Sequence, residues 1–188
     1  QVALLWVRDA PGVTAPLRTR APAEIRLADS ATPSPLRVAL VGNPNCGKST
    51  LFNALTGLRQ RVANFPGVTG ERRDGSYASA HGRVAVTDLP GIYGLSPQSP
   101  DETIAVDVLR GRARGVPRVD VIVLVLDAEQ LDRSLYLATQ VLELGIPTVV
   151  ALNRMDRAIA ANVCIDVPEL IHELGAVVVP IVASRGQG

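Results

Sequence analysis

The sequence predicts an α/β fold with a mostly parallel six-stranded sheet and helices on both of its faces. The first observation is that short apolar runs alternate with segments of helical pattern from Leu36 onward. The second is that Val119–Leu126 and Ile146–Leu152 are apolar on both faces, as are buried strands of parallel sheets. Crossovers between such strands place helices on either side of the sheet and ligands beyond its carboxyl edge.

The first half of this pattern contains three predicted strands and one helix. Leu36–Val41 is an apolar strand that runs into a glycine-bounded loop, and Lys48–Thr56 is the helix that follows it. Arg72–Ser79 and Arg83–Thr87 are expected to pair as a hairpin, because turn-forming residues separate two runs with strand character.

The second half contains three more helices and the remaining strands. Asp101–Arg110 is predicted to be helical, since its first turn carries two acidic residues that suit the helix dipole. The expected helices Leu131–Leu144 and Val167–Leu174 are each followed by glycine, a common end of a helix. Ala176–Val182 is the last predicted strand.

Composition narrows the class of protein. The 188 residues include 19 Lys+Arg and 18 Asp+Glu, so the net charge is only +1. A protein that coats nucleic acid or lies on anionic lipid needs a basic excess, so we expect no nucleic-acid partner. No apolar run approaches the roughly 20 residues that cross a bilayer, so we expect no direct membrane insertion.

Residues 1–35 differ from the rest because they hold five prolines among small residues and arginines. We predict that residues 1–35 are an N-terminal extension or linker and that residues 36–188 form the functional domain. The two cysteines, Cys46 and Cys164, are too few for a disulfide scaffold and are expected only to pack.

A phosphate-binding loop follows the first strand. Residues 42–49 read GNPNCGKS and match the G-x-x-x-x-G-K-[ST] pattern between a strand and a helix. Its glycines allow close approach to phosphate oxygens, Lys48 reaches the β- and γ-phosphates, and the Ser49 hydroxyl ligates Mg²⁺. Lys48 is the only lysine of the chain. The predicted contacts of this loop are Gly42, Asn43, Pro44, Asn45, Cys46, Gly47, Lys48, Ser49 and Thr50.

Two further loops are expected around the γ-phosphate and its metal. The segment Gly67, Val68 and Thr69 lies after the loop helix, where the threonine hydroxyl completes the Mg²⁺ shell when a triphosphate is bound. Residues 88–91 read DLPG. Asp88 is expected to hold Mg²⁺ through a water and the Gly91 N–H to bond the γ-phosphate, with Leu89 and Pro90 shaping the turn.

A base-binding loop is predicted at the end of Ile146–Leu152. Asn153, Arg154 and Asp156 match N-K-x-D with arginine in place of lysine. A carboxylate at Asp156 can accept two hydrogen bonds, from the N1–H and the exocyclic amine of guanine, a donor pattern that adenine lacks. Backbone N–H groups of Val182, Ala183 and Ser184 are expected to approach the guanine carbonyl oxygen.

These segments, in this order, resemble the TRAFAC class of P-loop GTPases, which have a Ras-like fold. The sequences of residues 38–57, 64–73 and 88–102 are similar to the cytosolic G domain of the ferrous iron transport protein B (FeoB) family, and the resemblance extends over residues 36–188. Arg154 departs from the usual lysine, and Val182 replaces a common serine.

The resemblance implies a GTP-binding and GTP-hydrolysing regulatory domain of a bacterial Fe²⁺ transporter, using GTP/GDP and Mg²⁺. It also implies a location on the cytoplasmic face of the inner membrane. Helical and permease domains of the same parent chain would follow beyond Gly188.

Catalysis is expected to depend on Asn45, Lys48, Thr69 and Gly91. Many GTPases place a glutamine after D-x-x-G, but this chain has Ile92, which cannot orient water. Related GTPases with asparagine at the position of Asn45 use it to help bind K⁺ beside the phosphates, so we predict slow, K⁺-stimulated hydrolysis.

Two alternatives stay open from the sequence alone. An Era-type GTPase of ribosome assembly or RNA modification would share the phosphate loop, but it usually has G-T-T where this chain has Gly67-Val68-Thr69. A nucleotide switch with negligible turnover would be consistent with Ile92.

Overall fold

The computed structural model describes residues 34–57, 60–65 and 71–188. Residues 34–188 form one compact unit. The predicted extension, residues 1–35, falls almost wholly outside the described residues, so its role remains a prediction. No helix among the described residues has the length and apolar character that a bilayer crossing requires.

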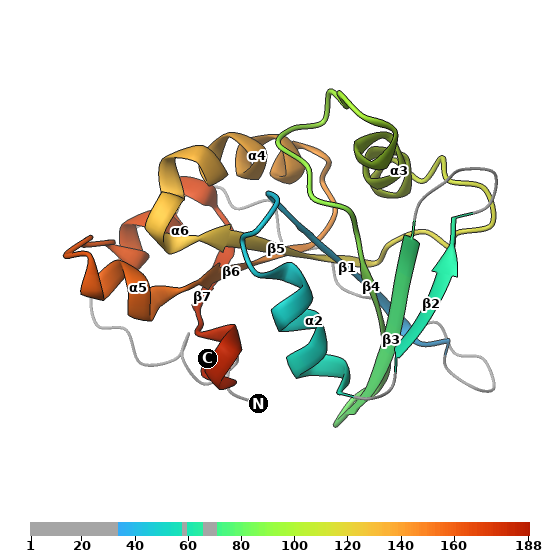
Figure 1. Cartoon of the computed structure of the whole chain (residues 1–188), viewed down its shortest axis with the longest axis horizontal. Helices are drawn as coiled ribbons and strands as arrows, with labels where there is room; N and C mark the ends of the chain where they lie inside the picture. The colour runs from blue at the N-terminus through green and yellow to red at the C-terminus, as the bar shows by residue number, and fades with distance from the viewer. Residues whose placement is uncertain (1–33, 58–59, 66–70) are drawn as a thin grey trace, which may run out of the picture. The chain divides into compact units, whose positions relative to one another are not determined.

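A mixed sheet organises the described unit, and five of its strands are parallel (Figure 1). Its order is β2-β3-β4-β1-β5-β6-β7, with β2 antiparallel to β3 and β3 antiparallel to β4. The strands are β1 Leu36–Gly42, β2 Gln60–Asn64, β3 Glu71–Ser79, β4 Gly82–Asp88, β5 Val121–Asp127, β6 Thr148–Asn153 and β7 Val177–Pro180.

The predicted α/β class and mostly parallel sheet are confirmed, but the predicted number of six strands is wrong. The seventh strand is β2, an edge strand in which Arg61 and Val62 are both exposed. A strand exposed on both faces shows no alternation of polar and apolar residues, so hydrophobic periodicity does not reveal it. The last strand, β7, ends at Pro180, earlier than expected.

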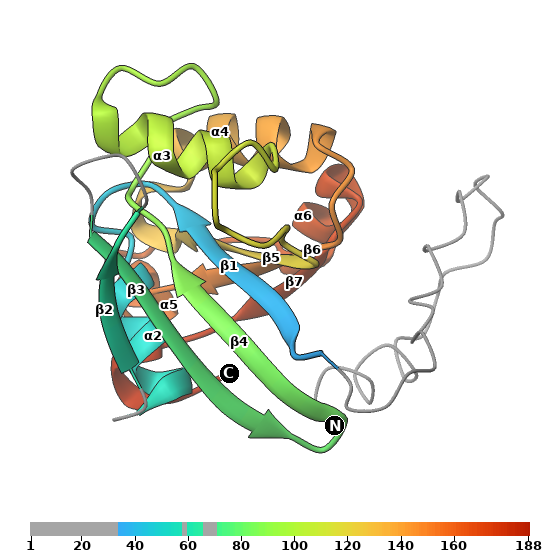
Figure 2. The same cartoon turned by 90° about the vertical axis from the view of Figure 1, so that its right-hand side faces the viewer.

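Helices cover both faces of the sheet, as Figure 2 shows. They are α2 Lys48–Thr56, α3 Pro100–Leu109, α4 Leu131–Glu143, α5 Met155–Ala160 and α6 Val167–Leu174. Helix α3 begins where Ser99 accepts a hydrogen bond from the Glu102 N–H, and Asp166 caps α6 in the same way. Helix α5 was not predicted from the sequence, because it is short and begins without a side-chain cap.

The core consists of aliphatic layers on either side of the sheet. The larger layer joins α3, α4 and α6 to strand residues such as Val41, Leu124 and Leu152. On the other face, Phe52 of α2 packs with Leu40 and neighbouring valines of β4. These layers fix the strands in register, so the carboxyl ends of β1, β4, β5, β6 and β7 meet at one edge.

Candidate functional site

The loop after β1 is tightly wrapped, and its two glycines are needed because neighbouring atoms leave no room for a side chain at either position. A Cβ on Gly42 would lie 2.4 Å from the Val125 carbonyl oxygen. A Cβ on Gly47 would lie 2.3 Å from Asn153 Nδ2, and the φ of Gly47 is 98°. Asn45 is also left-handed, with φ 64°. This is the backbone of a phosphate cradle that opens at the start of α2.

Lys48 is held inside this cradle. Its Nζ donates to the carbonyl oxygens of Gly42 at 3.0 Å and Asn43 at 2.9 Å, and the residue is buried. These bonds place the ammonium at the mouth of the loop, where a bound polyphosphate needs a compact positive charge.

Ser49 and Asp88 meet beside Lys48, although 39 residues separate them in sequence. The Ser49 hydroxyl donates to Asp88 Oδ2 at 2.9 Å, and Asp88 Oδ1 is buried with no partner among the described residues. Burial raises the pKa of the Asp88 carboxyl, while Ser49, Lys48 and Arg73 act to lower it. An unpaired carboxylate oxygen next to a hydroxyl is the hard oxygen donor set that suits Mg²⁺.

The D-L-P-G segment lies directly against the phosphate loop. A Cβ on Gly91 would be 2.8 Å from the Pro44 nitrogen, and the Ile92 N–H donates to the Gly42 carbonyl at 3.2 Å. Leu89 is buried, and Pro90 is half-buried. The Ile92 side chain is completely buried in the larger core layer, so it packs and does not face the phosphate site.

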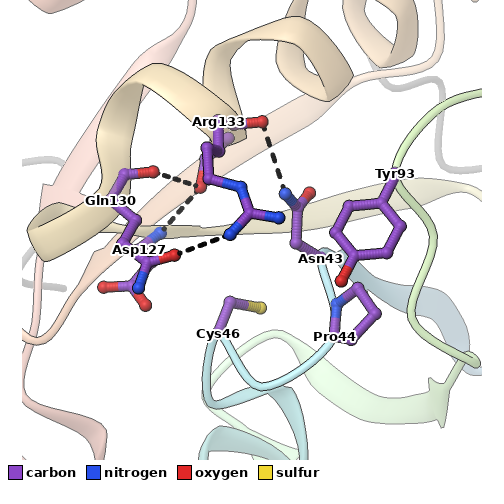
Figure 3. Close-up of a pocket in the computed structure, with 8 residues that line it drawn as sticks. Asn43, Pro44, Cys46, Tyr93, Asp127, Gln130 and Arg133 are labelled. Atoms are coloured by element: carbon purple, nitrogen blue, oxygen red, sulfur yellow. Dashed lines mark hydrogen bonds between the residues drawn. The ribbon is translucent and has the colours of Figure 1, made fainter.

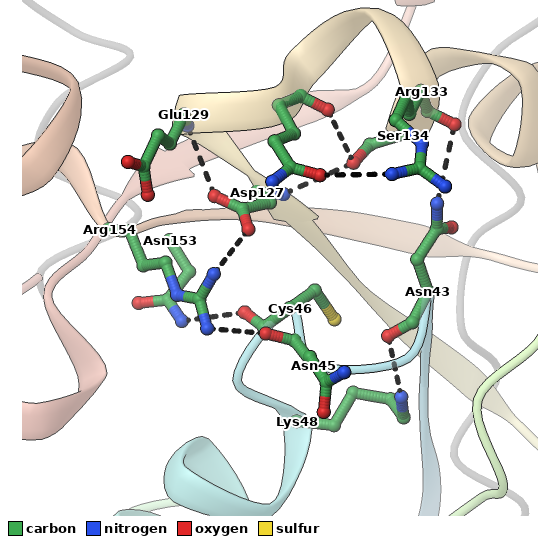
Figure 4. Close-up of polar contacts among 11 residues, drawn as sticks. Asn43, Asn45, Cys46, Lys48, Asp127, Glu129, Arg133, Ser134, Asn153 and Arg154 are labelled. Atoms are coloured by element: carbon green, nitrogen blue, oxygen red, sulfur yellow. Dashed lines mark hydrogen bonds and ion pairs between the residues drawn. The ribbon is translucent and has the colours of Figure 1, made fainter. Parts of the chain in front are cut away.

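Asn153 joins the base-binding loop to the phosphate loop (Figure 4). Its Nδ2 donates to the Cys46 carbonyl at 2.9 Å, and its Oδ1 accepts from the Ala183 N–H at 3.0 Å. Arg154 Nη2 donates to the Asn45 carbonyl, and Nη1 pairs with Asp127 Oδ2 at 2.5 Å. Three segments predicted separately from the sequence therefore meet at one site.

Asp156 lies in the first turn of α5 and is partly exposed. Its Oδ2 is 3.4 Å from Nη2 of Arg185. In the last predicted segment, the N–H groups of Val182 and Ala183 already donate to Gln187 O and Asn153 Oδ1. Of the three N–H groups predicted to approach a base, these two are already bonded within the protein. Ser184, which is exposed, is therefore the residue of this segment whose N–H best suits a base.

The remaining predicted site residues lie either outside the described residues or around the phosphate loop. Gly67, Val68 and Thr69 lie outside the described residues. Asn45 and Thr50 are exposed at the cradle and at the start of α2. Cys46 is buried, as expected of a packed residue, and burial raises the pKa of its thiol, whereas Cys164, which was also expected to pack, is exposed.

Sequence reasoning missed a small polar pocket behind the phosphate loop (Figure 3). Asn43 Nδ2 donates to the Arg133 carbonyl at 3.3 Å, and the Arg133 guanidinium lies 5.9 Å from the centre of the Tyr93 ring. The lining residues are Asn43, Pro44, Cys46, Tyr93, Asp127, Gln130, Arg133 and Ser134. Asp127 ends an apolar strand at the ligand-binding edge, and that position is the signal that could have revealed it.

A second missed contact holds the chain after D-L-P-G. Gln140 Oε1 accepts from the Leu95 N–H at 2.6 Å, and Arg110 Nη2 donates to the Leu95 carbonyl at 3.3 Å. The N–H of Leu95 is therefore bonded to a side chain of α4, and its carbonyl to a side chain at the C-terminal end of α3. Nothing in the local sequence connects residues so far apart.

A phosphate cradle at the carboxyl edge of a mostly parallel sheet, with a hydroxyl–carboxylate pair beside it and a second, carboxylate-bearing loop at the same edge, defines a P-loop nucleotide-binding protein. The family described as Ferrous iron transport protein B matches residues 36–188. The chain belongs to that family, and these residues are its G domain, so the predicted resemblance is confirmed.

Individual relatives agree with this assignment. The Fe(2+) transporter FeoB of Salmonella typhimurium is 50% identical over 158 residues, which cover 81% of this chain and 20% of the transporter. The crystal structure of the G domain of the T. maritima FeoB iron transporter is 40% identical, has a TM-score of 0.73, and covers 82% of this chain and 92% of that domain. The cytosolic domain of T. maritima FeoB in its GMPPNP form is 40% identical with a TM-score of 0.76, covering 81% of this chain and 59% of that one. The family assignment does not favour the Era-type alternative.

Proposed function

We propose that residues 36–188 bind GTP and GDP with Mg²⁺ and hydrolyse GTP to GDP and phosphate. The observation that carries this proposal is the junction of Lys48, Ser49 and Asp88, in which a buried ammonium lies next to an oxygen donor set of hydroxyl and carboxylate. Relatives with this fold include a cytosolic domain solved in a GMPPNP form and others in GDP forms.

In this proposal each group has a defined task. The cradle amides and Lys48 grip the β- and γ-phosphates, while Ser49 and Asp88 hold Mg²⁺, with Asp88 acting through a water. Bound Mg²⁺ supplies positive charge to the β- and γ-phosphate oxygens as charge develops on them. Thr69 is assigned to the same metal, and the Gly91 N–H to the γ-phosphate.

The base is read at the other end of the site. Asp156 accepts hydrogen bonds from the N1–H and the exocyclic amine of guanine in place of its ion pair with Arg185, and the Ser184 N–H donates to the guanine carbonyl. Because the Ile92 side chain is buried in the core, it does not orient the attacking water. Hydrolysis is therefore slow, and K⁺ held by Asn45 supplies part of the missing charge stabilisation.

The parent protein gives this activity its context. The relative of Salmonella typhimurium is named an Fe(2+) transporter, and the matched part of this chain spans one fifth of its length. We assign the domain to the cytoplasmic face of a bacterial inner membrane, where its nucleotide state regulates Fe²⁺ passage through a permease domain. A helical domain would link the two.

Phosphate release from GTP under single-turnover conditions tests the proposal. At fixed ionic strength, KCl should give a faster rate than NaCl, and GDP should compete with GTP where ADP does not. Tight GTP binding without phosphate release in either salt would instead support the switch with negligible turnover. Equal rates in KCl and NaCl would contradict the K⁺ assignment at Asn45.

A further inference from the structure

We propose that the loop between α3 and β5, residues 110–118, is a docking surface for the anionic phospholipid headgroups of a membrane. These residues read RGRARGVPR and contain four arginines and no acidic residue. The net charge of the whole chain is only +1, so the rest of the chain carries a net negative charge. The balanced composition therefore hides a concentrated positive segment, which we call the basic loop.

The arginines of the basic loop are displayed toward solvent. All four are exposed, namely Arg110, Arg112, Arg114 and Arg118. Ala113 and Val116, which lie between them in sequence, are half-buried and pack against the larger core layer. Because its apolar side chains are held by the core, the basic loop keeps its charged side chains on the outer side.

The backbone of the basic loop folds back on itself. The N–H groups of Arg112 and Ala113 donate to the Asp107 carbonyl at 2.7 and 3.2 Å, which extends the end of α3 by a turn. Gly111 has φ 67°, and a Cβ at that position would lie 3.3 Å from Arg118 Nε. Arg118 therefore lies against the first turn of the loop, so the arginines at the two ends of the loop are close together.

The positive charges of the basic loop are not neutralised within the part of the chain that the structure describes, where none of its arginines forms an ion pair. Arg110 Nη2 donates to the Leu95 carbonyl at 3.3 Å, which is a neutral acceptor. The nearest acids along the chain are Asp107 and Asp120, and the Asp120 carboxylate accepts from the Arg37 N–H at 2.8 Å. Like charges held in one loop repel one another, and an anionic surface relieves this repulsion.

The basic loop leads to the edge of the sheet opposite the nucleotide site, and Figure 2 shows the chain passing from α3 to the start of β5. After the loop, the Asp120 N–H donates to the Arg37 carbonyl at 2.9 Å, and β5 begins with Val121 beside Val38 of β1. Strands β1 and β5 are parallel, so their starts lie away from the carboxyl edge that holds Lys48. A membrane in contact with the basic loop would therefore leave the nucleotide site open.

Phospholipid headgroups fit the basic loop better than other polyanions do. Guanidinium groups bind phosphate oxygens in a planar fork. Residues 107–120 contain no aromatic side chain on which a nucleic-acid base could stack. Residues 110–118 also lack the leucine, isoleucine, methionine and aromatic anchors that protein interfaces bury. The loop thus offers charge without an anchor, which suits a surface that attracts basic segments by charge alone.

Co-sedimentation of the full chain with vesicles tests the inference. It rests on the proposed location of the domain beside a membrane, but its test needs no nucleotide. Phosphatidylcholine vesicles with about one third phosphatidylglycerol should bind the chain about a hundredfold more tightly than pure phosphatidylcholine in about 50 mM KCl. Binding to the anionic vesicles should fall at least about tenfold in about 300 mM KCl, because salt screens exposed charges.

The basic-loop variant is Arg112→Gln/Arg114→Gln/Arg118→Gln. Its binding to the anionic vesicles should fall about a hundredfold, which is about fivefold for each arginine. The melting temperature and the GDP affinity of this variant should match those of the unsubstituted chain, because the three side chains are exposed and lie outside the nucleotide site.

The matched control is Arg61→Gln/Arg83→Gln/Arg157→Gln, which removes the same charge from exposed arginines of β2, β4 and α5. This control should weaken vesicle binding by less than about threefold, because its arginines lie outside the basic loop. Equal losses in the two triple variants would mean that net charge alone draws the chain to lipid, and this result would overturn the inference.

Three other results would also overturn it. The first is equal binding of the unsubstituted chain to the anionic and the neutral vesicles. The others are tight binding of a fluorescent oligonucleotide or of polyglutamate that the basic-loop variant abolishes while its vesicle binding stays unchanged. GDP binding without vesicle binding would leave the proposed nucleotide function standing and the docking surface wrong, and vesicle binding without GDP binding would do the reverse.

Discussion

The phosphate end and the base end of the site are built in different ways. At the phosphate end, Lys48 bonds to carbonyls only five and six residues away. At the base end, Asn153 and Arg154 bond to loop carbonyls 107 and 109 residues away. The hydrogen bonds of Lys48 are local to one motif, whereas those of Asn153 and Arg154 depend on the packed sheet that brings β1 and β6 to the same edge.

This difference leads us to expect that changes at the phosphate end abolish binding directly. Changes at the base end should alter selectivity and the rate of release.

The largest effect is expected at Lys48. Lys48→Ala should weaken GTP binding by about a thousandfold, because it removes the one ammonium that the cradle positions. Lys48→Arg should lose most of the affinity as well, since the buried site is fitted to a compact group and not to a planar fork. Titration calorimetry measures both, and an affinity of Lys48→Arg within about fivefold of the unsubstituted chain would contradict this view of the phosphate end.

Asp156 should control selectivity and not overall stability. Asp156→Asn should lower GTP affinity by about a hundredfold and raise the affinity for xanthine nucleotides, because the amide offers a donor where the carboxylate offered an acceptor. Competition of GTP and XTP for one fluorescent nucleotide gives the ratio directly. Unchanged GTP affinity would remove Asp156 from the base site, and an equal loss of both nucleotides would point to misfolding.

Asn153 links the two ends of the site, so replacing it should lower the stability of the folded chain. Asn153→Ala removes two buried hydrogen bonds and leaves the Cys46 carbonyl and the Ala183 N–H without that partner. We expect the free energy of unfolding to fall by about 3 kcal/mol, measured by urea denaturation. Ser79→Ala, which removes two exposed hydrogen bonds of the hairpin, is a suitable control and should cost under about 1 kcal/mol.

Asp88 should show opposite effects on stability and on metal binding. Burial raises its pKa in the folded chain, so the carboxylate is destabilising once the pH exceeds that raised value, and stability increases as the pH falls through it toward the ordinary value of 3.8. Asp88→Asn should therefore raise the unfolding free energy of the nucleotide-free chain by about 1 kcal/mol at neutral pH while weakening Mg²⁺-dependent nucleotide binding. In the unsubstituted chain, Mg²⁺ dependence should fade on acidification at a higher pH than an ordinary aspartate would give. A destabilised Asp88→Asn variant at pH 7 would reverse the sign of this argument.

The smallest effect is expected at Arg185. Its pair with Asp156 is 3.4 Å long, and its side chain is 61% exposed, so solvent screens it. Arg185→Ala should leave the melting temperature unchanged within error and alter GDP affinity by no more than about threefold. A larger loss of affinity would mean that Arg185 contacts the nucleotide itself.

The same contrast explains what could be predicted from sequence. The phosphate loop was predictable because its spacing, its strand and its helix are contiguous, and α2 begins and ends where the pattern indicates. A short motif singled out Asp156, whose contact with the base stays a prediction, but no motif singled out Asp127, because its partners come from other loops. Strand β2 was not predicted because Arg61 and Val62 are both exposed, so the strand shows no alternation of polar and apolar residues. Helix α5 was not predicted because Arg154, which precedes it in a left-handed conformation, is not a capping residue.

The central claim is that one nucleotide contacts the cradle around Lys48 and the carboxylate of Asp156 at the same time. Calorimetric titration of the full chain with GDP, GMP and ADP tests it most directly, because GMP lacks the β-phosphate and ADP lacks the guanine edge. We predict that GDP binds at least about a hundredfold more tightly than either. Equal affinities for GDP and ADP, or for GDP and GMP, would contradict the account.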